Sequence, residues 1–184
     1  MIQSYEDYIA YLEADKKMLH ATGKRPMLLG DEEWKFERLL RKLEYYLNCK
    51  KSPIWNPYIL FLKYRFYRAQ KRMLYFIPRN VCGPGLALHR EYIGINPGAK
   101  IGKNCRIHTG VVIATKAGGH HDAPTIGDNV YIGPGAKIFG DIHIANGIAI
   151  GANSVVTKSF EEENITIAGV PAKKISDKGS KGLL

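Results

Sequence analysis

An isoleucine recurs every six residues through the second half of this 184-residue chain. A small or apolar residue stands four places after most of these isoleucines, and Gly follows several of them directly. A fixed period of six is typical of a β-solenoid built from hexapeptides, whereas an α-helix repeats every 3.6 residues and an ordinary strand every two. We therefore expect the isoleucines to point into a solenoid core and the glycines to form tight corners with positive φ. The repeat consists of Ile95, Ile101, Ile107, Ile113, Ile126, Ile132, Ile138, Ile144 and Ile150, closed by Val156.

The ladder is interrupted once. Ile113 and Ile126 are 13 residues apart, which is one period plus seven inserted residues within ATKAGGHHDAPT. A loop that leaves a regular solenoid has no packing role, so the insertion is a good place for function.

Helical periodicity replaces the six-residue period near the N-terminus. Ser4 and Asp7 match a capping box in front of a first helix. Asp31 is placed to cap a second helix, and Asn56-Pro57 suits the N-cap and first position of a third. That third helix interleaves aromatic residues with Lys and Arg.

The motif CGPG at residues 82–85 marks the change from one pattern to the other. We expect an N-terminal α-helical domain over residues 1–80, a mostly β solenoid domain over 81–176, and a frayed tail over 177–184.

The formal net charge is +10, and it is unevenly distributed. No acidic residue occurs between Glu44 and Glu91, a stretch that contains nine Lys and Arg residues. Such a field favours acidic or phosphorylated ligands, although a solvated or subunit-facing helix accounts for the same charge. No nucleic-acid-binding motif accompanies it, so we expect no nucleic-acid partner.

The three cysteines, Cys49, Cys82 and Cys105, match no zinc spacing. Their small odd number favours a reduced cytoplasmic environment. The acidic, amphipathic start does not resemble a signal peptide, and no apolar run is long enough to span a bilayer. The basic aromatic third helix also suits weak association with the inner face of an anionic membrane, or packing against other helices.

The ladder, the AGGHH loop and the ending GVPAKKI together resemble the hexapeptide-repeat acyltransferases. The similarity is greatest to the serine acetyltransferase family, including shorter relatives from polysaccharide-synthesis gene clusters, and covers roughly residues 78–176. It implies a left-handed parallel β-helix with three hexapeptides per coil. It also implies a homotrimer with active sites between subunits, acetyl-CoA as co-substrate, and no metal.

Acetyl transfer from a thioester to a hydroxyl needs a base for the hydroxyl proton and a donor for the oxyanion. His89 aligns with the catalytic histidine of the family and is our candidate base; its alternative role is a corner histidine bonded to a backbone carbonyl. Direct transfer needs no enzyme nucleophile, so none is assigned to a cysteine. The family has an Asp before this histidine, where this chain has Leu88, which leaves Glu91 as a candidate to orient His89.

The acceptor-binding residues also depart from the family pattern. An Arg-His pair before the loop proline is absent, so His120 and His121 are candidate replacements. Arg90 is a candidate for an anionic acceptor, and His108 is either part of the substrate site or a plain outward-facing side chain. L-serine is the acceptor that the resemblance implies, with a sugar or polysaccharide precursor as the alternative.

For acetyl-CoA, the family uses backbone groups along the groove between solenoids. By motif these fall at Thr115, Pro134 and Ala152, of which Pro134 has only its carbonyl to offer. Lys116 and Lys158 are candidates for the CoA phosphates, or ordinary solvated lysines. The backbone N–H groups of Gly118 and Gly119 are candidates for the oxyanion.

Two other classes of protein account for some of these features. Zinc carbonic anhydrases share this type of solenoid, and His89, His108 and His120 or His121 supply three imidazoles, but their spacing differs from that family and the GVPAKKI ending favours CoA. A non-catalytic scaffold is a further alternative, although such a solenoid would be expected to lose the loop and His89, which this chain keeps.

Overall fold

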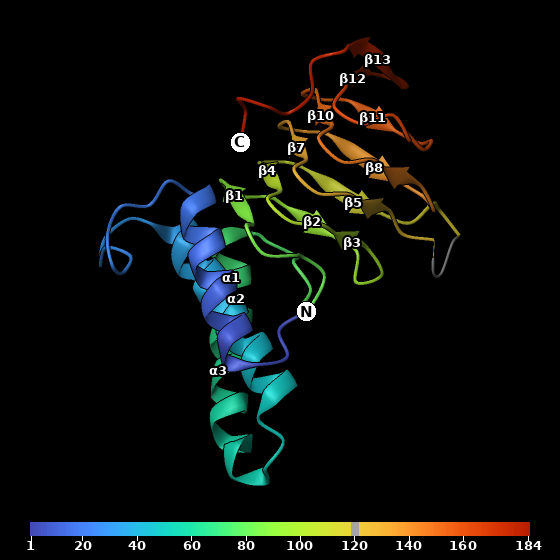
Figure 1. Ribbon diagram of the computed structural model, residues 1–184. Helices are drawn as coiled ribbons and strands as arrows, with labels where there is room; N and C mark the ends of the chain where they lie inside the picture. The colour runs from blue at the N-terminus through green and yellow to red at the C-terminus, as the bar shows by residue number, and fades with distance from the viewer. Residues whose placement is uncertain (119–121) are drawn as a thin grey trace.

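A group of helices precedes a triangular solenoid in the computed structural model, which describes residues 1–118 and 122–184 (Figure 1). The helices are α1 (Tyr5–Met18), α2 (Glu32–Cys49), the short 3-10 helix η1 (Pro53–Trp55) and α3 (Asn56–Met73). Within the described part of the chain, no helix is both long and apolar enough to cross a membrane.

The helix starts follow the sequence prediction in one case of three. The capping box is confirmed, since Ser4 Oγ accepts from Asp7 N at 3.0 Å and Asp7 Oδ2 accepts from Ser4 N at 3.2 Å. Asp31 is the N-cap residue of α2, but its carboxylate accepts from Met27 N instead of capping the helix. Asn56 is already inside α3, because η1 turns the chain just before it.

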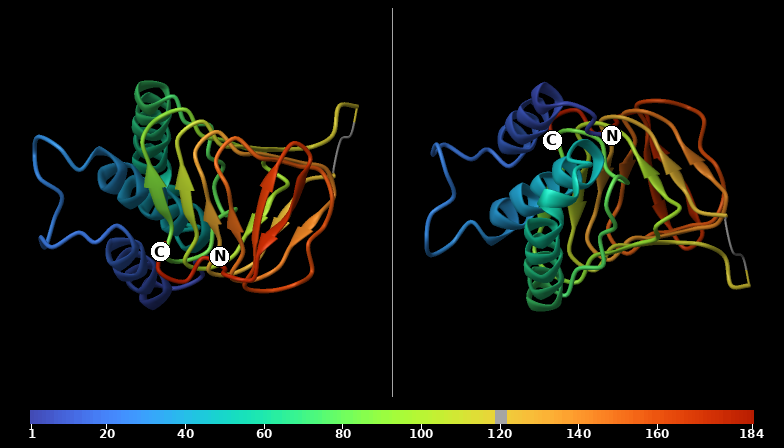
Figure 2. Two further views of the ribbon diagram at one scale, coloured as in Figure 1. Left: turned by 90° about the horizontal axis from the view of Figure 1, so that it is seen from above. Right: turned by 90° about the horizontal axis from the view of Figure 1, so that it is seen from below.

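The solenoid consists of three sheets whose strands are parallel except for the last one, β13, and each full coil adds one short strand to each sheet (Figure 2). We call them the first sheet (β1-β4-β7-β10-β12-β13), the second sheet (β2-β5-β8-β11) and the third sheet (β3-β6-β9). The predicted left-handed parallel β-helix with an N-terminal helical domain is confirmed. The strands are β1 (Ala87–His89), β2 (Gly94–Ile95), β3 (Lys100–Ile101), β4 (Arg106–His108), β5 (Val112–Ala114), β6 (Thr125–Ile126), β7 (Tyr131–Ile132), β8 (Lys137–Phe139), β9 (His143–Ile144), β10 (Ala149–Ile150), β11 (Val155–Val156), β12 (Thr166–Gly169) and β13 (Ala172–Ser176).

The isoleucine ladder forms the core, as its period predicts. Every isoleucine of the repeat is at most 5% exposed. In the second sheet Ile95 pairs with Ile113, Ile113 with Ile138, and Ile138 with Val156, so the ladder residues stack directly from coil to coil. Each isoleucine buried in this way contributes on the order of 1.5–3 kcal/mol relative to exposure.

The glycines after the isoleucines serve a different purpose from the one predicted. Gly102 does not have positive φ; a side chain on it would lie 2.6 Å from the carbonyl oxygen of Gly127 in the next coil. The left-handed corner positions are occupied by other residues, among them Asn104 and Asn129. These glycines are therefore needed for close approach of successive coils, and asparagine tolerates the positive φ at the corners.

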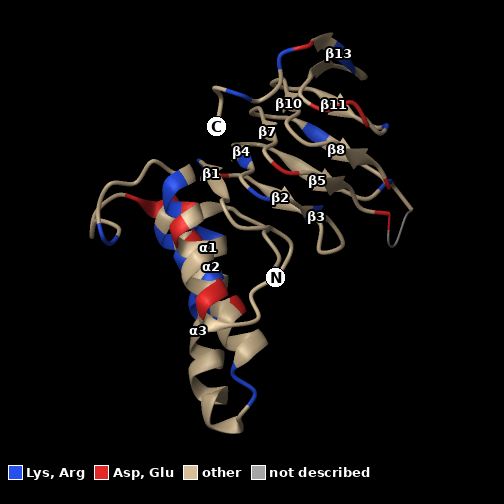
Figure 3. Ribbon diagram, viewed as in Figure 1, with Lys and Arg blue, Asp and Glu red and all other residues tan. Residues whose placement is uncertain are grey.

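Carboxylates of the helical region cover the open edge of the first coil. Asp15 of α1 accepts from Gly85 N and Leu86 N, both at 2.8 Å, and Glu37 of α2 accepts from Leu88 N at 2.8 Å. A solenoid end exposes unpaired N–H groups that invite strand addition. Acidic positions lie on α1 and α2, whereas α3 has none (Figure 3). The helices thus cap the solenoid and hold β1 in place.

The C-terminal segment is held against the solenoid instead of fraying. After the β12–β13 hairpin, Ser180 is 2% exposed and its N–H donates to Gly147 O at 2.9 Å. The carbonyl of Leu183 accepts from Arg106 Nη1 at 2.9 Å. The backbone of the last coil and one arginine therefore order a segment whose composition suggests disorder.

Candidate functional site

His89 lies outside the solenoid at the end of β1. Strand alternation buries Leu88 in the core and turns the His89 ring outward. His89 pairs in register with His108 of β4, and the two imidazoles stack with ring centroids 4.8 Å apart and 12° between planes. Tyr131 of β7 packs against His108, and the centroids of these two rings are 5.0 Å apart.

A cavity of about 600 Å³ opens beside His89, between β1 and the segment that joins α1 to α2. We call it the His89 cavity. It is lined by groups of both charges and by an aromatic wall, including His20, Arg25, Asp31, Glu33, Trp34 and Arg90. The predicted base and the predicted anion-binding Arg90 therefore meet in one cavity, together with acidic groups that suit a cationic part of a ligand.

His89 is uncharged at neutral pH. Burial, followed by repulsion of an imidazolium by the nearby His108, Arg106, His20 and Arg90, lowers its pKa to about 4. The pKa of His108 is lowered too, by burial and by Arg106. Within the described residues, the Nε2 atoms of both histidines are buried without a hydrogen-bond partner. An unprotonated imidazole with an unused nitrogen is the state that a general base requires.

Arg106 joins three distant parts of the chain next to this cavity. Its Nη2 donates to Met18 O at 3.0 Å and lies 3.0 Å from His20 Nε2, while Nη1 donates to Leu183 O. A guanidinium cannot accept, so His20 Nε2 must be the acceptor and the His20 ring presents its proton at Nδ1. Arg106 thereby holds His20 at the cavity.

Glu91 lies on an exposed turn after β1, where its backbone carbonyl accepts from Thr109 Oγ1 at 2.7 Å. Among the described residues, no carboxylate forms a hydrogen bond with the His89 ring. One carboxylate does contact the backbone next to His89: Oε1 of Glu33 accepts from Arg90 N at 3.4 Å.

The other predicted residues lie at two different corners of the triangle. Pro134 and Ala152 follow strands of the first sheet, at the corner that also carries His89. Both are exposed, and the Pro134 carbonyl already accepts from Asn153 N at 2.8 Å.

Three predicted residues lie where the second sheet leads into the third, away from His89. They are exposed or half-buried, and the Lys116 stem passes over Gly140 of the next coil. The loop after β5 leaves the solenoid on the side opposite β1 and the helices (Figure 2). The residues at this corner are Thr115, Lys116 and Lys158, with Gly118 in the loop. Gly119, His120 and His121 lie outside the described residues.

The two cysteines of the core have thiols with raised pKa values. Burial raises the pKa of the Cys82 thiol, and it raises the pKa of the Cys105 thiol to about 12. Both thiols are therefore protonated at neutral pH, and neither suits a nucleophile. Over residues 1–118 and 122–184, no three His, Cys, Asp or Glu side chains are grouped to hold a metal ion.

Several cavity residues were missed by the sequence reasoning. His20, Asp31, Glu33 and Trp34 come from a segment that reads as the end of one helix and the start of the next. Arg106, which holds His20 at the cavity, lies within the six-residue repeat. No local pattern marks these four residues, because what they share is proximity to β1, which lies about 60 residues further along the chain.

Comparison with known proteins gives consistent matches. The family model described as "Bacterial transferase hexapeptide (six repeats)" matches residues 123–158. A serine acetyltransferase from Neisseria gonorrhoeae is 28% identical, with a TM-score of 0.72; the match covers 95% of this chain and 68% of that one. A serine acetyltransferase from Brucella abortus is 24% identical, with a TM-score of 0.75, covering 96% of this chain and 72% of that one.

The matched enzymes have also been solved with ligands. The Neisseria enzyme is known in complex with serine, and the Brucella enzyme in complex with coenzyme A. Because the matches cover 94–96% of this chain, they include the helical region as well as the solenoid.

Proposed function

Taking the chain as a hexapeptide-repeat O-acetyltransferase of the serine acetyltransferase family, we propose that it moves acetyl from acetyl-CoA to the hydroxyl of L-serine with His89 as general base. The observation that carries the assignment of the base is the neutral, outward-facing His89 ring at the mouth of a cavity that holds both cationic and anionic groups. Arg25 and Arg90 suit the carboxylate of a zwitterionic acceptor, and Asp31 and Glu33 suit its ammonium group.

The reaction is a direct transfer. His89 takes the proton of the acceptor hydroxyl as the oxygen attacks the thioester carbon, and an oxyanion forms on the former carbonyl oxygen. The intermediate collapses by breaking the carbon–sulfur bond. The imidazolium of His89 then returns its proton to the CoA thiolate, so that free CoA and the acetyl ester leave. No bond to the protein forms at any point.

We propose that the neighbouring subunit completes the site. His89 and Arg90 lie at the corner that leads into the second sheet, whereas Thr115, Lys116, Gly118 and Lys158 follow the strands of that sheet, at its other end. One chain cannot bring both corners to the same acetyl group. In a homotrimer, the loop corner of one subunit would lie against the His89 corner of the next, with CoA between them.

A saccharide acceptor is a second candidate, favoured by the size of the cavity. A volume of about 600 Å³ falls in the range of about 300–1,000 Å³ typical of pockets for ligands much larger than an amino acid. The absence of the Arg-His pair that precedes the loop proline in the serine enzymes also removes groups that would help to hold a serine carboxylate.

An acceptor panel tests this function. CoA release from acetyl-CoA is measured with L-serine, with other amino acids, and with free and nucleotide-linked sugars. We expect acceptor-dependent release with L-serine; release with a sugar alone would transfer the assignment to the second candidate. Release with no hydroxyl acceptor, or stoichiometric zinc in the purified protein, would contradict the acetyltransferase mechanism proposed for His89.

The pH profile of this activity follows from the pKa of His89. Because that pKa is about 4 instead of the usual value near 6.5, we expect kcat/KM to stay level down to about pH 5 and to fall below it. His108 lowers the pKa of His89, so the His108→Gln variant should raise that pKa and move the acidic limb to higher pH. The profile is measured where circular dichroism shows a folded protein. An acidic limb near pH 6.5 in the unmodified chain would show that His89 does not titrate as described.

A further inference from the structure

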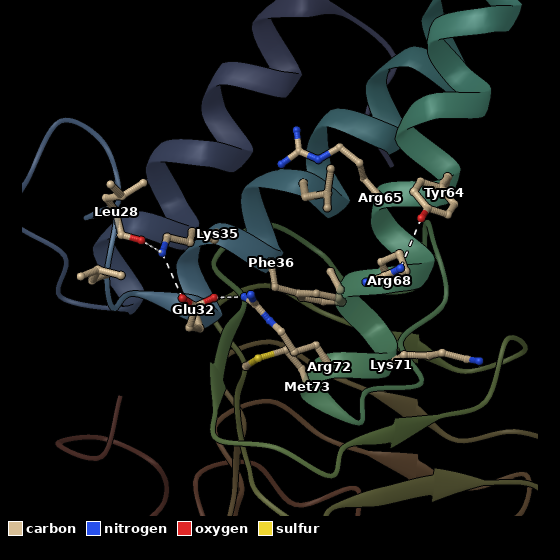
Figure 4. Close-up of a pocket in the computed structure, with 13 residues that line it drawn as sticks. Leu28, Glu32, Lys35, Phe36, Tyr64, Arg65, Arg68, Lys71, Arg72 and Met73 are labelled. Atoms are coloured by element: carbon tan, nitrogen blue, oxygen red, sulfur yellow. Dashed lines mark hydrogen bonds and ion pairs between the residues drawn. The ribbon is translucent and has the colours of Figure 1, made fainter.

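A second hollow, of about 980 Å³, lies on the helical region and shares no lining residue with the His89 cavity (Figure 4). It runs between the loop before α2 and the second half of α3, over an apolar floor that includes Phe36 and Met73. Five cationic side chains surround it, namely Lys35, Arg65, Arg68, Lys71 and Arg72, with Glu32 as the single acidic residue of its lining. We call this hollow and its rim the basic face.

Two of the five cations pair with a carboxylate and share its single negative charge. Glu32 pairs with Lys35 at 3.0 Å and also with Arg72 (Figure 4). The remaining three are Arg65, Arg68 and Lys71. Within the described residues no carboxylate pairs with them; they lie over the rings of Phe61, Tyr64 and Tyr67, respectively, at 4.8–6.0 Å. The basic face therefore has an excess of positive charge, and its three unpaired cations lie over aromatic rings.

The rim of the basic face presents two leucines almost fully to solvent. Leu28 is 90% exposed and Leu29 is 87% exposed. The loop that carries them is held in this position by polar contacts: Lys35 Nζ donates to Leu28 O at 2.7 Å, and Met27 N donates to Asp31 Oδ2 at 2.9 Å. Two adjacent large apolar side chains held outward on one side of a hollow, with unpaired cations on the other side (Figure 4), are characteristic of a surface that another apolar phase covers.

Charge argues against a second copy of the chain as that cover. In a two-fold contact, the same patch meets itself, so Arg65, Arg68 and Lys71 would face their own equivalents. α3 has no acidic residue to relieve the repulsion. A nucleic acid would satisfy the cations but would leave Leu28 and Leu29 in water.

We propose that the basic face docks on an anionic lipid membrane. Leu28 and Leu29 enter the boundary between headgroups and acyl chains, and Arg65, Arg68 and Lys71 contact lipid phosphates. Tyr64 and Tyr67, 57% and 53% exposed, lie at headgroup level, where amphipathic rings are favoured. The loop before α2 borders the His89 cavity on its other side, through Met27 and Asp31. Docking therefore brings that cavity close to the lipid surface.

Co-sedimentation with vesicles tests the proposal on the full chain. We expect binding to vesicles of phosphatidylcholine with phosphatidylglycerol, little binding to phosphatidylcholine alone, and loss of binding at high salt. Because each basic residue near an anionic surface contributes about 1 kcal/mol, reversing two of them, in the Arg65→Glu/Arg68→Glu variant, should weaken binding tenfold or more. The Leu28→Asp/Leu29→Asp variant should weaken it at least as much.

Matched substitutions at the far end of the solenoid serve as controls. Val170 and Ile175 are 72% and 64% exposed, so Val170→Asp/Ile175→Asp changes the same number of exposed apolar side chains and should bind like the unmodified chain. Equal binding by the basic-face variants, or equal binding to neutral and anionic vesicles, would overturn the proposal. So would a smaller oligomer for the leucine variant in sedimentation without lipid, since the leucines would then contact a second copy.

Discussion

The His89→Ala variant is expected to lose about 10²–10⁴-fold in kcat/KM while keeping its fold and its oligomeric state. The ring of His89 is outside the core, so its removal leaves no internal cavity, and Leu88 continues to anchor β1. The loss arises because no other described group at the end of β1 brings an uncharged imidazole to the lining of the cavity. His108 stacks behind His89 and cannot occupy the same position.

Steady-state CoA release measures this effect, with sedimentation and circular dichroism as checks on structure. His143→Ala is the matched control: His143 is an outward-facing histidine of the third sheet that pairs with Glu161 at 2.6 Å, remote from the cavity. That control should turn over normally. If His89→Ala keeps turnover within a few-fold of the unmodified enzyme, His89 is not the base. Residual activity in His89→Ala should also lack the acidic limb that the unmodified chain shows.

The Arg41→Met variant is expected to lose about 3–5 kcal/mol of unfolding free energy. Arg41 is fully buried, and it donates to Asp15 at 2.8 Å, to Glu44 at 3.1 Å, and to the carbonyls of Cys82 and Gly83. Burial disfavours the charged guanidinium, but the carboxylates of Asp15 and Glu44 outweigh it and raise the pKa of Arg41. Removing the cation leaves two buried carboxylates without their partner.

Urea unfolding measures the loss as a lower midpoint with an unchanged slope. Arg72→Met is the matched control, since Arg72 also pairs with a carboxylate, that of Glu32, but its side chain is 67% exposed. Its effect should stay below about 1 kcal/mol. Making the site neutral as a whole, in Arg41→Met/Asp15→Asn/Glu44→Gln, should recover part of the loss. A single Arg41→Met variant as stable as the unmodified chain would contradict this account.

The same network links the helical region to the reaction. Asp15 both holds Arg41 and accepts from the backbone N–H groups of Gly85 and Leu86, directly before β1. Arg41 and Asp15 thus position the strand that carries His89, and their role in activity is to place that strand.

The core and the solenoid were predictable because they depend on local repetition. The six-residue period determines which side chain points inward at every coil, so burial of Ile95 through Ile150 follows without knowledge of distant contacts. The capping box at Ser4 and Asp7 is local in the same sense. By contrast, the reason for Gly102 was mistaken, since it is set by a carbonyl in the next coil 25 residues later, at Gly127.

The candidate site was predictable only in part. His89, Arg90 and His108 follow from motif and register, and the structure brings them to one corner. His20, Glu33 and Arg106 depend on how α1 and α2 dock on the first coil, and the sequence contains no periodic signal for that docking. The Asp31 prediction was wrong for a different, local reason: Met27 N, four residues earlier, donates to the carboxylate that was expected to cap α2.

By itself the sequence determined the solenoid, its buried ladder and the strand end that carries His89, because a repeated short period dictates side-chain direction through local geometry alone. The tertiary structure decided how the solenoid edge is capped and which helical residues share the cavity with His89. These features arise from buried ion pairs and hydrogen bonds between residues up to 88 positions apart, such as Met18 and Arg106. Their free energy depends on desolvation and exact placement, which no local pattern of residues encodes.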